Sequence, residues 1–433
     1  MIDPTPNPVN NPLQASRQMK WASALSTRPS LEAALTEVLE RARQKLEAPA
    51  DLGLIFISAA FASEYPRLMP LLQEQLSGIA VIGCSGGGVV GIDGGDQPQE
   101  IEGQAALSLT LAHLPDVRAK VFQIAPESLP DLDSPPQAWV DLIGVPSEQH
   151  PHFILLADPF SSGTNDLLQG LDFAYPGAVK VGGLASTGAM AGRVSLFADF
   201  QLYQEGVVGV ALSGNLVMEA IVAQGCRPIG QPFRVTQGER NILLALEKQT
   251  NGDMTNFGAQ SCTPLEALRA IIQDLSEADR ALAQNSLFIG VARDEFKQEL
   301  QQGDFLIRNL LGVDPRVGAI AIADRVRTGQ RIQFHLRDAR TSAEDLELLL
   351  QRYQQEEAIK TTSPVAAFMF TCMGRGETLY QQPSFDSTLF ERYFAAMPLS
   401  GFFCSGEIGP VGGATFLHGY TSVFGICRQP GSE

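Results

Sequence analysis

Hydrophobic and polar positions follow the same order three times along this chain. In each copy, an apolar run is followed by a helical stretch, a second apolar run and a turn crowded with glycine. The first apolar runs of the copies are Leu52–Phe61, Phe153–Phe160 and Ala366–Gly374. Short apolar runs bounded by turn residues are typical of buried strands. The pattern therefore predicts three strand–helix–strand units.

The glycine-rich turns that close the copies stand at Gly83–Gly91, Gly182–Gly192 and Gly401–Gly413. Because glycine has no side chain, such turns let the backbone approach another group closely. We expect the amides of these turns to line one or more pockets. The residues of the first two turns that are expected to line a pocket are Cys84, Ser85, Gly86, Gly87 and Gly183.

Outside the copies, helical spacing predicts a helix at Ser30–Leu46, with Ser30 as its N-cap, and a long helix at Ser342–Gln355. The apolar stretch Gly206–Ala223 contains a Gly-Asn turn. It is interpreted as a β-hairpin and not as a membrane span. A turn is predicted at Gln224–Gly230.

Strands alternate with helices, yet many strands are expected to be linked as hairpins. This favours an α/β fold of the mixed α+β kind, with mixed sheets flanked by helices, over a doubly wound parallel sheet. A chain of 433 residues is too long for a single ordinary core, so two domains are expected. We place a disordered segment at residues 1–18 and the two domains at 19–236 and 237–428.

Composition restricts the functions that are open to the chain. It is 44% hydrophobic and 18% charged, with a net charge of −17. That charge opposes binding to nucleic acids and insertion at anionic membranes. The N-terminus has no apolar signal core and the six cysteines form no CxxC pair, so we expect reduced thiols in a cytoplasmic protein. No cluster of ligand residues has zinc spacing, and neither a metal nor a cofactor is expected.

The first turn matches two catalytic patterns. Gly83–Gly87 (GCSGG) fits the hydrolase pattern G-x-S-x-G with Ser85 as nucleophile, and Gly86–Gly91 fits the dinucleotide pattern G-x-G-x-x-G. Both patterns require a helix directly after the turn. The sequence that follows, VVGIDGGDQPQ, does not favour one. Both activities are therefore disfavoured.

Charged candidates are concentrated in the second half of the chain. In FHLRDA, alternation places His335 and Arg337 on one face of a strand, with Asp338 directly after it. Arg337 could point into a pocket and grip a carboxylate in bidentate fashion. Alternatively, Arg337 and Asp338 form a surface ion pair, and Asp338 marks the start of a helix.

Cys372 ends a very apolar strand and precedes Arg375, whose charge would lower the pKa of a nearby thiol. The alternative is that Cys372 is a small buried side chain. Cys84 and Cys404 hold similar places, each before Ser-Gly. Glu407 lies in an apolar, glycine-rich segment, either as a solvated loop residue or as the partner of a ligand ammonium or of an arginine.

A set of short strings, taken in order, resembles the FIST proteins. The resemblance covers about residues 20–428, as a FIST N domain followed by a FIST C domain, and the opening MKWASALSTRPSLEAAL resembles stand-alone bacterial members such as those of cyanobacteria. The strings that carry it are DLGLIFIS, VIGCSGGG, VGGLAS, QGCRPIG, GDFLIRNLLGVD, IQFHLRDA, FTCMGRGE, GFFCSGEIGPVGG and HGYTS.

This resemblance implies an intracellular sensory domain that binds small ligands, with amino acids the usual suggestion, and it brings no established catalytic residues. Eukaryotic relatives join FIST domains to an F-box, for which residues 1–50 are too short and too polar. No signalling segment is appended, so any output is expected to pass through a protein partner.

Three hypotheses remain open. The first is a sensor that binds an amino acid or another small anion or zwitterion between the two halves, with backbone amides from one half and charge from the other. The second is an enzyme with Cys372, or less favourably Ser85, as nucleophile. The third is a protein-interaction scaffold that binds no small ligand.

Overall fold

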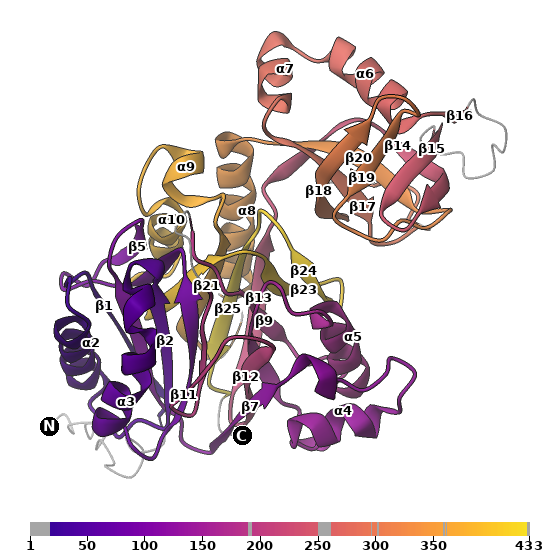
Figure 1. The fold of residues 1–433 in the computed structure, drawn as a ribbon. Helices are drawn as coiled ribbons and strands as arrows, with labels where there is room; N and C mark the ends of the chain where they lie inside the picture. The colour runs from indigo at the N-terminus through magenta and orange to yellow at the C-terminus, as the bar shows by residue number, and fades with distance from the viewer. Residues whose placement is uncertain are drawn as a thin grey trace, which may run out of the picture.

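The computed structural model describes residues 18–188, 193–249, 261–295, 297–300, 303–357, 360 and 362–430. The disordered segment expected at residues 1–18 lies, apart from Gln18, outside the described residues. The chain forms two domains (Figure 1). We call residues 20–223 and 339–428 the body, and residues 226–337, which are inserted within it, the barrel.

The body consists of three units with the same order of elements. Unit 1 comprises β1 (Lys20–Ser26), α2 (Leu31–Leu46), β2 (Leu52–Ser58), α3 (Tyr65–Gln75), β3 (Ala80–Gly86), β4 (Gly88–Ile92), β5 (Pro98–Glu102) and β6 (Leu107–His113). Unit 2 comprises β7 (Val117–Ile124), α4 (Pro136–Ile143), β8 (His152–Ala157), α5 (Thr164–Ala174), β9 (Lys180–Leu184), β10 (Leu196–Ala198), β11 (Gln201–Tyr203) and β12 (Val207–Gly214).

Unit 3 follows the same order, with the barrel between its first strand and its first helix. It comprises β13 (Val217–Ala223), α8 (Ala339–Glu357), β21 (Pro364–Cys372), α9 (Gly376–Tyr380), α10 (Phe385–Tyr393), β22 (Leu399–Cys404), β23 (Glu407–Val411), β24 (Ala414–His418) and β25 (Ser422–Arg428). The threefold pattern of the sequence is thus a threefold repeat of structure.

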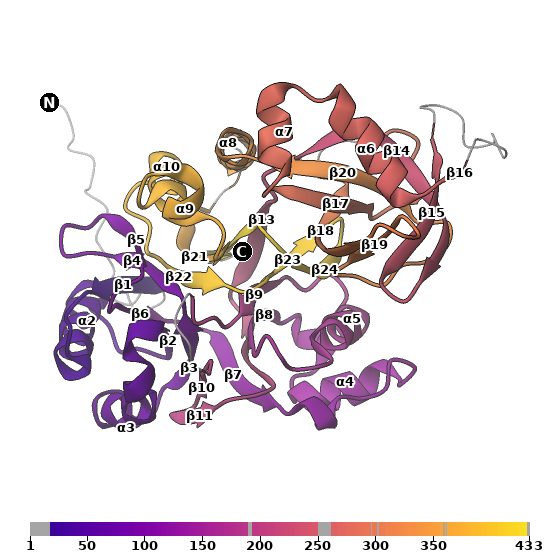
Figure 2. The ribbon, with the colours of Figure 1, turned by 45° about the horizontal axis from the view of Figure 1, so that its top comes forward.

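Each unit builds the same four-stranded sheet. The strand orders are β1-β6-β2-β3, β7-β12-β8-β9 and β13-β25-β21-β22. In every unit the last two strands of this order are parallel and the others antiparallel. Because a parallel pair needs a long crossover, the helices α3, α5 and α10 lie between these strands in sequence. The helices cover the outer faces of the sheets (Figure 2).

The units exchange their hairpins in a ring. The hairpin β4–β5 of unit 1 extends the sheet of unit 3 at β22, and β23–β24 of unit 3 extends the sheet of unit 2 at β9. The pair β10–β11 of unit 2 extends the sheet of unit 1 at β3. A central apolar cluster with side chains from all three units fills the space between the sheets. The body is therefore a single packed domain.

Three glycines hold equivalent positions in this repeat. Gly83, Gly182 and Gly401 pair with the same point of the preceding parallel strand. A Cβ at these glycines would lie 2.0, 1.8 and 1.8 Å from the carbonyl oxygen of that strand. No side chain fits at such distances. The three glycines, which were expected in turns, lie within strands and allow two parallel strands to approach closely.

The barrel is an antiparallel sheet that closes on itself. Its strand order is β14-β20-β17-β18-β19-β15-β16, and a further pairing of β14 with β15 completes the ring. Its own apolar cluster, with Phe233, Phe334 and Leu336, fills the interior. Its elements are β14 (Cys226–Glu239), β15 (Ile242–Lys248), β16 (Ser261–Cys262), α6 (Pro264–Asp274), α7 (Glu277–Ala283), β17 (Leu287–Ala292), β18 (Phe305–Asp314), β19 (Ala319–Ile322) and β20 (Arg331–Arg337).

The expected fold class, two domains of sheets and helices with mixed pairing, is confirmed, as is the Ser30 cap, which accepts a hydrogen bond from the Ala33 amide. The hairpin expected at Gly206–Ala223 is wrong. Its two strands, β12 and β13, belong to the sheets of units 2 and 3, because the Gly-Asn turn marks a boundary between units.

The turn expected at Gln224–Gly230 is also wrong. Most of that stretch begins the long strand β14, which has a register shift between Ile229 and Phe233. The domain boundary that we place after residue 236 falls within the same strand.

Candidate functional site

The predicted charged residues of the second half meet where the barrel joins the body. Arg337 is the last residue of β20, and Cys372 ends β21 of unit 3. The Arg337 Nη2 donates a hydrogen bond to the Gly374 carbonyl at 2.6 Å. Glu407, at the start of β23, is close enough to Arg337 and Arg375 for their charges to act on its ionisation. The barrel contributes Arg337, and the body contributes the others.

Backbone hydrogen bonds fix the body side of this junction. The Cys372 amide donates to the Thr421 carbonyl at 3.0 Å, and the Thr421 amide donates to Glu407 Oε2 at 3.1 Å. The Gly374 amide donates to Cys372 Sγ at 3.4 Å. Tyr420, in the same loop as Thr421, has a φ of 62°, in the left-handed region that large residues rarely adopt. The loops at 372–376 and 418–422 therefore form a fixed frame.

Arg337 is a buried cation without a carboxylate partner among the described residues. It is 8% exposed, and its guanidinium lies 4.4 Å from the centre of the Tyr420 ring. Its Nε and Nη1 are buried and have no hydrogen-bond partner in the described part of the chain. Since a buried, unpaired cation is costly, this arrangement favours an anionic group as its partner.

Glu407 is fully buried, at 0% exposure. Burial raises the pKa of its carboxyl well above the ordinary value, although the Thr421 amide and the two arginines act against that rise. Its Oε1 has no hydrogen-bond partner among the residues described. Burial thus favours the neutral form of the carboxyl group, and one of its oxygens has no partner among the described residues.

The repeat supplies an internal comparison for Glu407. Glu407 pairs with Gly183, the residue directly after Gly182. In the other two hairpins, the residues that pair directly after the equivalent glycine are Val89, opposite Phe402, and Leu196, opposite Cys84. All three residues are fully buried. Because packing at this position is satisfied by an apolar side chain in two of the three units, the carboxyl group of Glu407 serves a purpose other than packing.

Arg375 has a different environment from Arg337. It is fully buried and forms a bidentate ion pair with Asp386, with nitrogen–oxygen distances of 2.7 and 3.0 Å, and it also donates to the Tyr380 hydroxyl. Burial alone would lower the pKa of Arg375, but Asp386 and Tyr380 raise it. Only its Nη1 lacks a partner within the described residues. Arg375 mainly anchors the loop that carries it.

The cysteines of the junction are protonated thiols. Burial and then Glu407 raise the pKa of Cys372 to about 12, and burial raises the pKa of Cys226 to about 12. Burial also raises the pKa of Cys84 and of Cys404 well above the ordinary value. The lowered pKa expected for Cys372 beside Arg375 is wrong, because burial raises the pKa and outweighs the opposing charge of Arg337.

Cys84 and Cys404 do not hold equivalent places in the repeat. Cys404 pairs with Cys372 and lies three residues after Gly401. Cys84 pairs with Phe56 and lies only one residue after Gly83, the equivalent glycine of unit 1. Cys404 instead adjoins Gly183, where a Cβ would lie 2.4 Å from its Sγ. Gly183 is therefore required for the packing of Cys404 and does not expose its amide.

The polar groups of the first turn are bonded within the protein. The fully buried Ser85 hydroxyl donates to the Ser186 carbonyl at 3.4 Å and accepts from the Ser195 amide at 3.0 Å. The Gly87 amide donates to the Ser186 hydroxyl at 2.8 Å. A Cβ at Gly86 would lie 2.6 Å from the Gly88 carbonyl oxygen. Close packing between units 1 and 2 accounts for these residues.

Asp338 caps the helix α8. Its carboxylate accepts from the Thr341 amide at 2.7 Å and from Arg227 Nε at 3.1 Å. Burial acts to raise the pKa of Asp338, but these hydrogen bonds together lower it below the ordinary value. This geometry matches the alternative interpretation of Asp338 as an ion-paired helix start, although its ion-pair partner is Arg227 and not Arg337.

Sequence reasoning missed two residues of the junction. Tyr420 stacks against Arg337, and Cys226 lies beside Arg337 as its register partner in β14. Both fall in strings that carry the family resemblance, HGYTS and QGCRPIG. The sequence signal for Tyr420 is a large side chain that directly follows a glycine in a turn.

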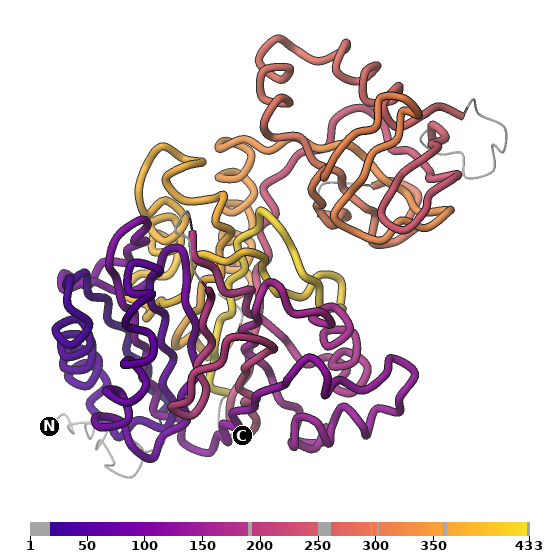
Figure 3. Tube along the Cα trace, viewed as in Figure 1, coloured from indigo at the N-terminus to yellow at the C-terminus, as the bar shows by residue number. Residues whose placement is uncertain are grey.

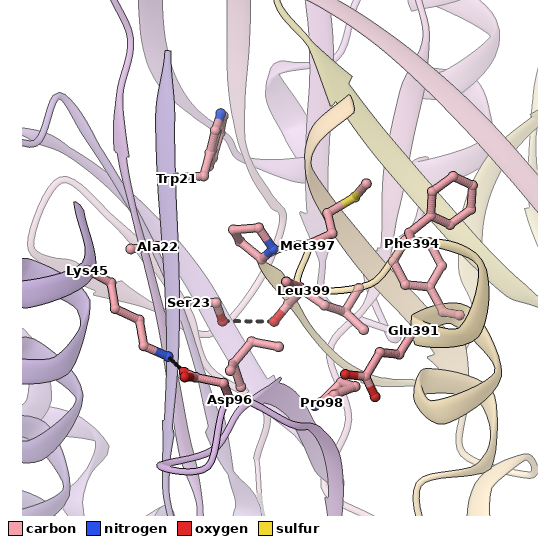
Figure 4. A pocket seen from close by; sticks show the side chains of 14 residues that line it. Trp21, Ala22, Ser23, Lys45, Asp96, Pro98, Glu391, Phe394, Met397 and Leu399 are labelled. Carbon is pink, nitrogen blue, oxygen red and sulfur yellow. Dashed lines mark hydrogen bonds and ion pairs between the residues drawn. The ribbon is translucent and has the colours of Figure 1, made fainter. Parts of the chain in front are cut away.

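A separate groove of about 280 Å³ lies between units 1 and 3 (Figure 4). It is mainly apolar, with Trp21, Phe394 and Met397 in its wall, and an ion pair between Lys45 and Asp96 stands at one side. The Ser23 hydroxyl donates to the Leu399 carbonyl at 2.8 Å. None of the residues predicted for the site lines this groove.

Two further observations concern the described residues as a whole. No three His, Cys, Asp or Glu side chains among them are grouped so as to hold a metal ion. No helix in this part of the chain is both long and apolar enough to cross a membrane.

Family models match most of the chain. Residues 51–249 match the FIST N domain and residues 264–410 match the FIST C domain. An uncharacterized protein of Mycobacterium tuberculosis is 33% identical over 410 residues, which span 94% of this chain and 99% of the relative. An uncharacterized protein of Mycobacterium bovis is also 33% identical over 410 residues, spanning 94% of this chain and 98% of that protein.

Among solved structures, PurLQS from Thermotoga maritima aligns with a TM-score of 0.23 and 10% identity, over 95% of this chain and 72% of that one. A likeness of this size carries no argument.

The matches define a two-part sensory architecture, a FIST N domain followed by a FIST C domain. The chain belongs to the FIST family, whose domains are in general sensory domains of signal transduction.

Proposed function

We propose that this protein senses a small anionic or zwitterionic metabolite, with an amino acid as the simplest candidate, and binds it between Arg337 and Glu407. One observation carries the proposal. A buried guanidinium with two unpartnered nitrogens and a buried carboxyl group with an unpartnered oxygen lie at the same junction. Unmade hydrogen bonds at buried groups cost about 1 to 3 kcal/mol each, so a ligand that supplies the partners gains that free energy.

The two ends of the site suit the two ends of an amino acid. A carboxylate would accept charge-assisted hydrogen bonds from Arg337, with the Tyr420 ring on one face of the guanidinium. An ammonium would donate to Glu407 Oε1 and would favour the ionised carboxylate there. A ligand with a carboxylate but no ammonium would leave Glu407 protonated, as a hydrogen-bond donor.

Binding can be tested by thermal shift with each standard amino acid and with the matching acid that lacks the amino group. If the Kd is submillimolar and the ligand is added at about 100 times that Kd, binding should add roughly 2.7 kcal/mol of stability. The matched control is Glu407→Leu, which places at this position the residue that unit 2 holds there. A shift in the wild type that is lost in Glu407→Leu supports the proposal. No shift with any compound, from a folded sample, contradicts it and leaves the interaction scaffold as the better hypothesis.

The catalytic alternative has less support. A nucleophilic Cys372 needs its thiolate, whereas burial raises the pKa of its thiol to about 12. The Ser85 hydroxyl is hydrogen-bonded to backbone groups of Ser186 and Ser195. Alkylation of Cys372 faster than that of free cysteine at neutral pH would restore this alternative.

A further inference from the structure

We infer that the ligand of this site also fixes the barrel against the body, so that the position of the barrel reports whether the site is occupied. This inference rests on the proposed function, because it concerns what the same ligand does once bound. It assigns the output of the sensor to the inserted domain.

The barrel is built as a body of its own. Its ring of strands pairs with no strand of the other three sheets among the described residues. Its main apolar cluster contains only residues between Ile229 and Leu336. The central cluster of the body, by contrast, joins all three units and includes no residue of the barrel. A domain with its own core can move as a rigid unit without exposing that core.

Two neighbouring chain segments attach the barrel (Figure 3). One enters at Cys226 and the other leaves at Arg337, and these two residues are register partners in β14 and β20. Gly225 precedes the first with a φ of 65°. Its amide donates to Asp345 at 3.0 Å and its carbonyl accepts from Ser342 at 3.0 Å, both in α8. This attachment is a narrow hinge that is fixed at its base.

Among the described residues, several contacts besides the chain connections cross from the barrel to the body around the site. The Arg337 Nη2 bonds to the Gly374 carbonyl at 2.6 Å, and the Arg308 Nη1 bonds to the Leu417 carbonyl at 3.1 Å. The rings of Phe288 and Tyr420 are 4.3 Å apart. These contacts reach the loop after β21 and the segment that runs from β24 to β25. The same two segments hold the frame that surrounds Cys372 and Glu407.

The two ends of the site belong to different domains. Arg337 is part of the barrel and Glu407 is part of the body. We call the barrel docked when it packs against the body as it does in this structure. A ligand that bonds to both residues adds a cross-link that exists only in the docked arrangement. It therefore binds the docked arrangement more tightly than any other, and by linkage it shifts the population toward that arrangement.

The test measures the distance between the domains in the full chain by double electron–electron resonance. Spin labels are placed at Leu311→Cys in β18 and Leu348→Cys in α8, whose native side chains are 61% and 64% exposed. Cys262 is replaced by Ser, because the other five cysteines are buried. Each standard amino acid is added in a separate sample, at a concentration about 100 times an assumed submillimolar Kd.

We expect the distance distribution to narrow with the amino acid that binds, and to stay at its ligand-free width in Glu407→Leu. Binding that is detected by calorimetry and leaves the distribution unchanged would overturn this inference, while the proposed function stands. Failure of every amino acid to bind the folded labelled protein would overturn the proposed function, and this inference with it.

Discussion

At the scale of single residues, Glu407 distinguishes the third unit from the other two. Val89 and Leu196 show that the position is compatible with a fully apolar environment. A buried carboxyl group with an unpartnered oxygen lowers stability, and such a cost is retained when the group contacts something else. We therefore propose Glu407, together with Arg337, as the ligand-binding pair of the molecule.

The substitution Glu407→Leu removes the unpartnered Oε1 but also takes the acceptor from the buried Thr421 amide, so the two effects oppose each other and we expect the free energy of unfolding to change by less than about 1 kcal/mol. Urea denaturation of both proteins in the absence of ligand measures the difference. Glu407→Gln, whose side-chain oxygen can still accept from the Thr421 amide, serves as the control. A loss of more than about 1 kcal/mol in Glu407→Leu would show that the carboxyl group has a structural role.

Glu100 gives a prediction about pH. It lies in β5, is 4% exposed and accepts from the Ser387 amide at 2.7 Å. Burial and then Asp386 raise the pKa of Glu100 to about 8. Between its ordinary pKa and about 8, the folded protein keeps a proton that the unfolded chain has lost. Stability due to this group therefore falls as pH rises, by at most about 1.4 kcal/mol per pH unit.

The substitution Glu100→Gln should reduce this slope, because glutamine does not titrate. The free energy of unfolding is measured by urea denaturation on both sides of neutral pH, for the wild type and the variant. The Glu102→Gln variant is the control, since Glu102 is only half-buried. An equal slope in the wild type and Glu100→Gln would contradict the assignment.

At the scale of elements, the sequence predicted strands and helices better than it predicted their partners. Apolar periodicity located all three crossover helices and the first strand of each copy, because these depend on local spacing. The pairing of β12 and β13 was missed because a Gly-Asn turn between two apolar strands fits a hairpin locally. The exchange of hairpins between units depends on contacts that are distant in sequence, and no local signal records it.

The sequence also predicts only part of the candidate site, because it shows which residues are locally unusual but not which contacts they make. Unusual residues in apolar segments indicated Arg337, Cys372, Arg375 and Glu407. The sequence predicts that the glycine-rich segments line a pocket, whereas Gly83, Gly182 and Gly401 allow two parallel strands to approach closely. The Gly87 amide, which was expected to line the pocket, donates a hydrogen bond to the Ser186 hydroxyl. The Ser85 hydroxyl accepts a hydrogen bond from the Ser195 amide. Only the close packing of units 1 and 2 reveals this.

The prediction at this scale concerns the three equivalent glycines, Gly83, Gly182 and Gly401. Gly401→Ala would place a Cβ 1.8 Å from the Met369 carbonyl oxygen, and the strand pair would have to separate. We expect a loss of about 3 kcal/mol or more in urea denaturation, or no folded protein. Gly312→Ala is the matched control, because a Cβ there meets no atom within 4 Å. Similar stability of the two variants would show that Gly401 is not needed for the close approach of the two strands.

At the scale of the whole molecule, one chain combines a continuous body with a separate barrel. The ring of exchanged hairpins ties the three units together, since each sheet contains strands of two units. The barrel shares no strand pairing with them among the described residues and meets them at the site. The proposed response of the barrel to a ligand rests on this division.

Isothermal titration is the most direct test of the central claim, that a small ligand bridges Arg337 and Glu407. The wild type, Arg337→Gln and Glu407→Leu are titrated with the amino acid that gives the largest thermal shift. Each substitution removes one of the two groups that are proposed to hold the ligand. We predict that each weakens binding by about 30-fold or more, the equivalent of about 2 kcal/mol. An unchanged Kd in both variants would contradict the account.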